Sequence, residues 1–227
     1  MWSFISQLFQ PESPCFLCQN LTGDVIGLCR ACQQDLPLTG RACLSCGMPV
    51  CGTACACNPA EWPFSAVLSA SYYQFPADHL IHQFKETPRP ELARPLARLM
   101  LQRIRRHAGP RPSLLVPVPA AANRLRERGF DQSLELARHL GTLLRIPVRH
   151  DVFQRTEGLP AQKGLNAGQR EANIRQAFKA LNLWALPKHV ALVDDVLTTG
   201  ATARHLAGLL HGAGVTRVEI WTVARTL

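Results

Sequence analysis

The sequence lacks any long uncharged apolar run, and it has no cysteine after residue 57. No run approaches the roughly 20 apolar residues that a membrane helix needs, so we expect no membrane span. The opening residues, Met1-Trp2-Ser3-Phe4, carry no basic side chain, which argues against a secretory signal and favours a cytoplasmic protein. Wholesale disorder is excluded too, because 47% of the 227 residues are hydrophobic and only 18% are charged.

The cysteine content and the net charge of the chain both change near residue 60. All nine cysteines lie between Cys15 and Cys57. We therefore predict a cysteine-rich module with an N-terminal helix over residues 1–60, and a second domain over residues 61–227. The segment from Lys85 to Arg128 holds eleven basic and three acidic side chains, a net charge of +8. This charge indicates a polyanionic partner, either a phosphorylated ligand or nucleic acid.

Apolar periodicity predicts strands that alternate with helices after residue 60. The predicted strands are residues 67–75, 113–118, 152–155, 190–193 and 218–223. The predicted helices are residues 79–84, 91–107, 133–144, 171–180 and 203–211. We predict loops over the basic residues 117–129 and the Gly-rich residues 156–168. A short helix over residues 2–9 either caps the fold or contacts a membrane or a partner. This alternation predicts an α/β fold on a parallel sheet, with ligands at the carboxyl ends of the strands.

The first four cysteines have the spacing of a metal site. Cys15-x2-Cys18 is followed after ten residues by Cys29-x2-Cys32. Two such turns present four thiolates to one ion, which is typical of a structural zinc ribbon. Disulfides and free thiols are the alternatives, although an odd cysteine count and a reducing compartment both disfavour disulfides.

A second zinc site is predicted from Cys43-x2-Cys46, which follows after ten more residues. Its other half comes from Cys51, Cys55 and Cys57, of which one is surplus. We expect Cys55 and Cys57 to complete the site and Cys51 to be left over. Redox switching by these thiols is the alternative function.

The richest motif runs from Val190 to Ala203, where an apolar strand leads into Asp194-Asp195 and then Thr198-Thr199-Gly200-Ala201-Thr202. Gly200 lets the backbone approach a ligand, and the N–H groups at the start of the next helix form an anion site. Two carboxylates beside that site suit the vicinal hydroxyls of a ribose. The motif therefore predicts a sugar-phosphate clamp. It is neither a Walker loop nor a dinucleotide fingerprint, and the alternative is a strand-to-helix turn capped by the Asp pair.

Residues 190–203 resemble the signature of type I phosphoribosyltransferases, which bind phosphoribosyl pyrophosphate. With its cysteine module, the chain is similar over nearly its whole length to the competence protein F (ComF/GntX) family. Further matching segments are Val116–Pro119, Arg124–Ser133, Arg155-Thr156, Gln162–Leu165, Arg170, Asn173 and Ala177-Phe178. The combination is far more specific than any one of these motifs.

The resemblance implies roles for these residues. Asp194 and Asp195 would contact the ribose hydroxyls, and the loop Thr198 to Thr202 would hold the 5′-phosphate. Pyrophosphate, with Mg²⁺ as its companion, would face the arginines of the basic loop, Arg124, Arg126 and Arg128. The alternative for these arginines is a solvated loop. Two departures from the family pattern, Leu159 in place of Thr and Asp131 in place of Asn, predict altered ligand contacts.

Two functions follow from the resemblance. A phosphoribosyltransferase would displace pyrophosphate from the ribose C1 by positioning and electrostatics, and no motif identifies the acceptor. Alternatively, the protein serves DNA uptake or the use of external DNA without catalysis, by binding single-stranded DNA or by contacting DNA-import proteins. In the second case Tyr72, Tyr73, Phe75 and Phe84 either stack on bases or belong to the core.

Overall fold

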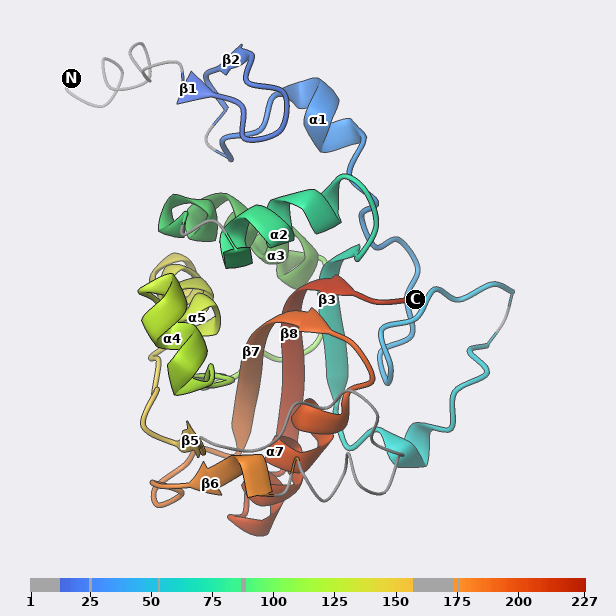
Figure 1. Cartoon of the computed structure of the whole chain (residues 1–227). Helices are drawn as coiled ribbons and strands as arrows, with labels where there is room; N and C mark the ends of the chain where they lie inside the picture. The colour runs from blue at the N-terminus through green and yellow to red at the C-terminus, as the bar shows by residue number, and fades with distance from the viewer. Residues whose placement is uncertain (1–12, 25, 53, 87–88, 157–173, 175) are drawn as a thin grey trace, which may run out of the picture.

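The computed structural model describes residues 13–24, 26–52, 54–86, 89–156, 174 and 176–227 (Figure 1). The predicted helix over residues 2–9 lies outside these residues. So do Leu159, Gln162–Leu165, Arg170 and Asn173, and the Gly-rich loop from residue 157 onward. No helix among the described residues is long and apolar enough to cross a membrane.

Four parallel strands form the main sheet, in the order β3 (Ala66–Tyr72), β8 (Arg217–Arg225), β7 (His189–Leu197) and β4 (Leu114–Pro117). The sequence prediction of an α/β fold on a parallel sheet is therefore confirmed. The two central strands, β7 and β8, carry almost continuous buried side chains, as expected for strands covered on both faces.

Helices cover both faces of this sheet. They are α2 (Ala77–Glu86), α3 (Ala93–Arg105), α5 (Gln132–Leu144) and α7 (Ala201–Gly212). One hydrophobic cluster joins α2, α3 and α5 to strand residues such as Leu68 and Trp221. The other joins α7 to Val67 and Ile220. Adjacent residues of one strand thus enter different clusters, because successive strand side chains point to opposite faces.

Shorter elements complete the described chain. They are β1 (Ser13–Pro14), β2 (Leu21–Thr22), α1 (Arg30–Gln34), the 3-10 helices η2 (Pro59–Glu61) and η3 (Pro90–Leu92), α4 (Ala122–Arg128), β5 (Phe153–Arg155) and β6 (Phe178–Ala180). Strands β1 and β2 pair antiparallel near the N-terminus, and β5 and β6 form a second antiparallel pair away from the main sheet (Figure 1).

Two secondary-structure predictions are wrong. The basic segment expected to be a loop contains helix α4, which ends at Gly129 in the left-handed conformation with φ 77°. Its Ala, Asn, Leu, Arg and Glu residues permit a helix, and Gly is the usual residue just after a helix end. The helix expected over residues 171–180 does not include Phe178–Ala180, which pair with β5 as strand β6. Tertiary pairing overrides the helical periodicity there.

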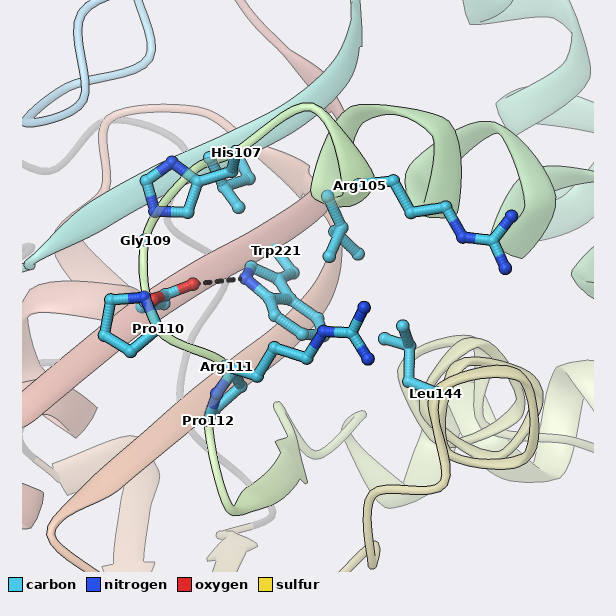
Figure 2. Close-up of a pocket in the computed structure, with 11 residues that line it drawn as sticks. Arg105, His107, Gly109, Pro110, Arg111, Pro112, Leu144 and Trp221 are labelled. Atoms are coloured by element: carbon cyan, nitrogen blue, oxygen red, sulfur yellow. Dashed lines mark hydrogen bonds between the residues drawn. The ribbon is translucent and has the colours of Figure 1, made fainter.

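Glu219 is a buried acid in the middle of the sheet, with a side chain 1% exposed. Its carboxylate accepts a hydrogen bond from the Trp221 indole Nε1 at 2.8 Å and lies 2.9 Å from His189 Nε2. Glu219 lines a small cavity of about 50 Å³, together with His107, Pro110 and Trp221, which are labelled in Figure 2. The buried acid is therefore a structural hub that satisfies two ring nitrogens.

Replacing Glu219 with Ala should lower the free energy of unfolding by about 2–4 kcal/mol, because the buried Trp221 and His189 nitrogens lose their partner. Glu219→Gln keeps one oxygen acceptor and should lose less. Urea denaturation of both variants measures the effect. An Ala variant within about 0.5 kcal/mol of the original chain would contradict this role.

Candidate functional site

Eight of the nine cysteines gather into two groups of four. The first group is Cys15, Cys18, Cys29 and Cys32, and the second is Cys43, Cys46, Cys55 and Cys57. Within each group all Sγ atoms lie within 4.8 Å of one another. Cys51 is exposed and belongs to neither group. The structure thus brings together the residues expected from the spacing, and both groups could hold a metal ion.

The sulfur geometry fits a tetrahedral ion. Sγ–Sγ distances are 3.6 Å for Cys18–Cys29, 3.7 Å for Cys43–Cys57 and 3.5 Å for Cys46–Cys55. Four sulfurs each 2.3 Å from a central zinc would lie about 3.8 Å apart. The four-thiolate donor set is that of a closed, structural site rather than a catalytic one.

In each group, backbone N–H groups favour the thiolate of one cysteine, and the thiolate is the form that binds metals. Burial opposes ionisation of Cys15, but N–H groups of Cys18, Cys29 and Leu17 outweigh it and lower the pKa of its thiol to about 7. One of these bonds joins the Cys29 N–H to the Cys15 Sγ at 3.3 Å. Cys43 behaves in the same way, because N–H groups in its turn outweigh burial and lower its pKa to about 7.

The paired carboxylates lie at the carboxyl end of the main sheet. Strand β4 pairs with β7 only as far as Val193, whereas β8 continues beside β7 to Leu197. Asp194 and Asp195 therefore lie beyond the end of β4, on an edge of β7 that β4 does not cover. This is where an open parallel sheet binds its ligands.

Asp194 is the more strongly perturbed of the two acids. Its Oδ1 accepts hydrogen bonds from the Ser133 hydroxyl at 3.0 Å and the Asp195 N–H at 2.9 Å. Burial and then the charge of Asp195 raise the pKa of Asp194 to about 7, against smaller opposing effects of these donors and of Lys85. The buried acid is thus near half protonation at neutral pH.

Asp195 pairs with a cation from another element. Lys85, at the end of α2, places its Nζ 3.0 Å from Asp195 Oδ2, and the acid side chain is 14% exposed. Sequence reasoning counted Lys85 only as part of a basic segment. Nothing in the local pattern of α2 indicates that its last turn reaches the end of β7.

The Thr198–Thr202 loop turns sharply at Gly200, which has φ +74° and directly precedes α7. Thr198 and Thr199 are exposed, whereas Ala201 and Thr202 are half-buried in the first helical turn. A Cβ at Gly200 would lie 2.6 Å from the Trp62 ring. Only glycine fits both the backbone angle and this contact. The loop has the shape expected of an anion site at a helix N-terminus.

Trp62 is a second residue that sequence reasoning missed. The Arg204 guanidinium lies 5.2 Å from the Trp62 ring centroid and donates to the Thr199 carbonyl at 2.9 Å. Trp62 and Arg204 therefore support the loop from one side. Trp62 follows the cysteine module directly in sequence, and no local pattern connects it with α7.

The three predicted pyrophosphate residues lie on α4. Arg124 and Arg126 are exposed and Arg128 is half-buried. Arg124 pairs with Glu127 at 3.0 Å, and Arg128 pairs with Glu86, the neighbour of Lys85, at 3.2 Å. The structure thus connects Arg128 with the end of α2.

Arg155, the last residue of β5, interacts electrostatically with Asp194. Burial and the charge of Arg124 lower its pKa, against an opposing effect of Asp194. Its guanidinium lies 5.4 Å from the Phe178 ring centroid. Next to it, the buried Thr156 Oγ1 has no hydrogen-bond partner within the described part of the chain.

Asp131 has a structural task. Its Oδ1 accepts from the Leu134 N–H at 3.0 Å and so caps α5, while its Oδ2 accepts from the Ala120 N–H at 3.0 Å. These bonds link α5 to the segment after β4. Asp at this position therefore accepts from two backbone N–H groups, one with each carboxylate oxygen. Asn, the usual family residue, has only one acceptor oxygen in its side chain.

Relatives of the chain cover nearly all of it, although no family model matches. DNA utilization protein YhgH of Salmonella typhi is 35% identical over 224 residues, covering 94% of this chain and 97% of the relative. The Escherichia coli K12 protein of the same name is 34% identical with the same coverage. Competence protein F of Haemophilus influenzae is 32% identical, covering 88% of this chain and 90% of the relative. The chain belongs to the competence protein F family. The family resemblance predicted from the motifs is confirmed.

Solved structures resemble part of this family member at lower identity. Glutamine phosphoribosylpyrophosphate amidotransferase from B. subtilis, complexed with ADP and GMP, is 19% identical with a TM-score of 0.43, covering 63% of this chain and 30% of that chain. Adenine phosphoribosyltransferase from Leishmania tarentolae is 20% identical with a TM-score of 0.36, covering 61% and 58%.

The raised pKa of Asp194 predicts a pH-dependent stability. Between its ordinary value of 3.8 and the folded value of about 7, the folded chain holds a proton that the unfolded chain releases. Stability therefore falls as the pH rises through this interval. Asp194→Asn should remove that dependence and be more stable than the original chain at pH 8, with little difference at pH 4.

Thermal unfolding across this pH range measures the effect. Asp151→Asn is the matched control, because the Arg149 hydrogen bond lowers the pKa of this acid. It should give no gain at pH 8. Parallel pH profiles of Asp194→Asn and the original chain would show that Asp194 ionises normally.

Proposed function

We propose that the chain binds a phosphoribosyl ligand of the phosphoribosyl pyrophosphate type at the carboxyl end of its parallel sheet. The single observation that supports this most is the junction of two acids with a helix N-terminus. Asp194 and Asp195 lie on the uncovered edge of β7, and the same strand leads into the Thr198–Thr202 loop. One short segment thus offers acceptors for a sugar diol and donors for a phosphate.

The proposed roles follow the chemistry of each group. The carboxylates of Asp194 and Asp195 accept hydrogen bonds from the ribose hydroxyls. The N–H groups of the Thr198–Thr202 loop and the hydroxyls of its threonines bind the 5′-phosphate, helped by the dipole of the twelve-residue helix α7. The close fit of Gly200 under Trp62 holds this loop in shape.

Pyrophosphate is proposed to lie toward α4 and α2. Arg124, Arg126 and Arg128 supply guanidinium forks there, and Lys85 and Arg155 add two cations beside the acids. Mg²⁺ is proposed to arrive with the pyrophosphate, and the partly exposed Asp195 carboxylate is the kind of hard oxygen donor that this ion prefers. In the free protein Lys85 forms an ion pair with Asp195 at 3.0 Å.

We place this binding function in the use of external DNA, because relatives are named DNA utilization protein and competence protein. We propose zinc as the ion of both cysteine groups, on the four-thiolate donor sets. The boundary between residues 60 and 61 is likewise proposed as the point where the cysteine module meets the phosphoribosyl domain.

Calorimetric titration with phosphoribosyl pyrophosphate, with and without Mg²⁺, tests the ligand. The double variant Asp194→Asn/Asp195→Asn should bind at least about tenfold more weakly, because it loses charged acceptors worth 1.4 kcal/mol or more. Asp151→Asn, which changes a carboxylate remote from β7 in sequence, should bind as the original chain does. Equal affinity of the original and the double variant would reject the proposed clamp.

Single-stranded DNA binding is the second candidate function, and one observation favours a particular surface. Burial lowers the pKa of His139 on α5, and the charges of Arg94 and Arg98 on α3 add to this effect against Glu135. Arg94 and Arg98 of α3 thus act electrostatically on α5, on one face of the sheet. The exposed Arg94 and Arg105 lie on α3 and are available to phosphates.

The salt dependence of single-strand affinity tests this surface. A plot of log affinity against log salt should have a slope of roughly −0.7 for each phosphate contact. Arg94→Gln/Arg105→Gln should make the negative slope shallower by about 1.4. Arg217→Gln, at the exposed start of β8, should leave the slope unchanged. A flat plot for the original chain would exclude phosphate contacts.

A further inference from the structure

Arg225, the last residue of β8, joins two parts of the protein that the sequence keeps far apart. Its side chain is buried, although it carries a charge. Its Nε donates to the carbonyl of Cys46 at 2.8 Å. Its Nη1 donates to the carbonyls of Leu197 at 3.1 Å and of Thr198. One guanidinium therefore binds the second cysteine group on one side and the start of the phosphate loop on the other.

All of these acceptors are backbone carbonyl oxygens, and a further one belongs to Thr226, at 2.7 Å. The planar fork of an arginine holds its acceptors in a fixed relative geometry. Arg225 therefore fixes the position of the Cys46 carbonyl relative to the Leu197 and Thr198 carbonyls. If the Cys46 carbonyl moved, the buried guanidinium would have to move with it or leave a buried donor unsatisfied, which is unfavourable.

The second cysteine group is seated directly on the sheet. The Leu44 carbonyl, inside the Cys43–Cys46 turn, accepts the Val67 N–H of β3 at 2.7 Å. Gly47 has φ +76°, and a Cβ there would lie 2.8 Å from the Val67 side chain and 3.4 Å from that of Arg225. The turn thus packs by its backbone against β3 and the Arg225 side chain, so a change in the shape of the turn acts directly on Arg225.

Trp62 contacts both Arg225 and the loop that Arg225 binds. Its ring centroid lies 5.6 Å from the Arg225 guanidinium and 5.2 Å from that of Arg204, and its edge covers Gly200. Arg204 in turn donates to the Thr199 carbonyl. The loop carbonyls of Thr198 and Thr199 are therefore held by two arginines that both contact one tryptophan.

The first cysteine group has a different neighbourhood. Cys15 and Leu28 belong to the hydrophobic cluster of α2, α3 and α5. No hydrogen bond recorded among the described residues joins Cys15, Cys18, Cys29 or Cys32 to the phosphate loop. The two groups thus provide a matched pair, one seated against the loop and one remote from it.

We propose that Arg225 is a positioning residue that couples metal occupancy of the second cysteine group to the shape of the Thr198–Thr202 loop. The ligand half of this coupling rests on the proposed phosphoribosyl function. Loss of the second metal loosens the loop and weakens ligand binding. By thermodynamic reciprocity, the bound ligand slows metal loss from the second group and leaves the first group unaffected.

Hydrogen–deuterium exchange on the full chain tests the coupling without any ligand. Amides of residues 198–202 should exchange about tenfold faster in Cys57→Ser, which removes a ligand of the second group, and at the original rate in Cys18→Ser. Arg225→Lys should retain two metal ions per chain by native mass spectrometry and still show the faster exchange. The control Arg217→Lys, at the exposed start of the same strand, should retain both metal ions and show the original rate of loop exchange.

Unchanged loop exchange in both Cys57→Ser and Arg225→Lys would overturn the proposal. If Arg225→Lys fails to fold, the comparison of Cys57→Ser with Cys18→Ser still tests the coupling, because both variants keep Arg225. Faster exchange in Cys18→Ser to the same degree would also overturn it, since the loop would then respond to general loss of stability.

Metal release into a coloured chelator tests the ligand half on the original protein. Phosphoribosyl pyrophosphate with Mg²⁺ should slow release of one of the two metal ions about tenfold and leave the other unchanged, and Arg225→Lys should abolish the difference. Ligand that binds in the titration but slows neither ion would overturn the coupling. A protein that binds no ligand in the titration would reject the proposed function instead, while the exchange experiment still decides the role of Arg225.

Discussion

Strand β7 continues four residues beyond Val193, where its pairing with β4 ends, and the candidate site is built in this step of the sheet. A strand with a partner on only one side exposes backbone and side chains on the other while remaining fixed by its neighbour. Here β8 keeps β7 rigid up to Leu197, so Asp194 and Asp195 are both accessible and well positioned. The start of the Thr198–Thr202 loop is fixed as well, because the loop begins at the paired end of β7.

Two adjacent acids at the end of a buried strand are unfavourable by themselves. Burial and mutual repulsion raise the pKa of Asp194, and the fold offsets this only in part through Ser133 and Lys85. Groups that destabilise a protein in this way persist where a ligand needs them. The contrast with Glu219 is informative, because that acid is only 1% exposed yet lies beside two ring nitrogens and serves the fold.

The two cysteine groups are alike in composition and different in surroundings. The first packs against the cluster formed by α2, α3 and α5, and so supports the helix that carries Lys85. The second lies against β3 and Arg225 near the Thr198–Thr202 loop. The cysteine module thus contacts the elements that supply both Lys85 and the turn before α7. A site placed between such supports depends on the whole chain rather than on the domain that contains its acids.

By itself, the sequence determined the features that depend on local order. Apolar periodicity is sufficient for the parallel α/β fold, thiol spacing for the cysteine groups, and the Asp-Asp-Thr-Thr-Gly order for the turn between β7 and α7. Helix α4 was missed in the sequence, where a loop was predicted, although no glycine or proline interrupts it before Gly129. Only the tertiary structure decided that Lys85, Trp62 and Arg225 meet this turn and that β6 is a strand. Periodicity records which face of an element is buried, whereas such contacts depend on how separate elements pack together.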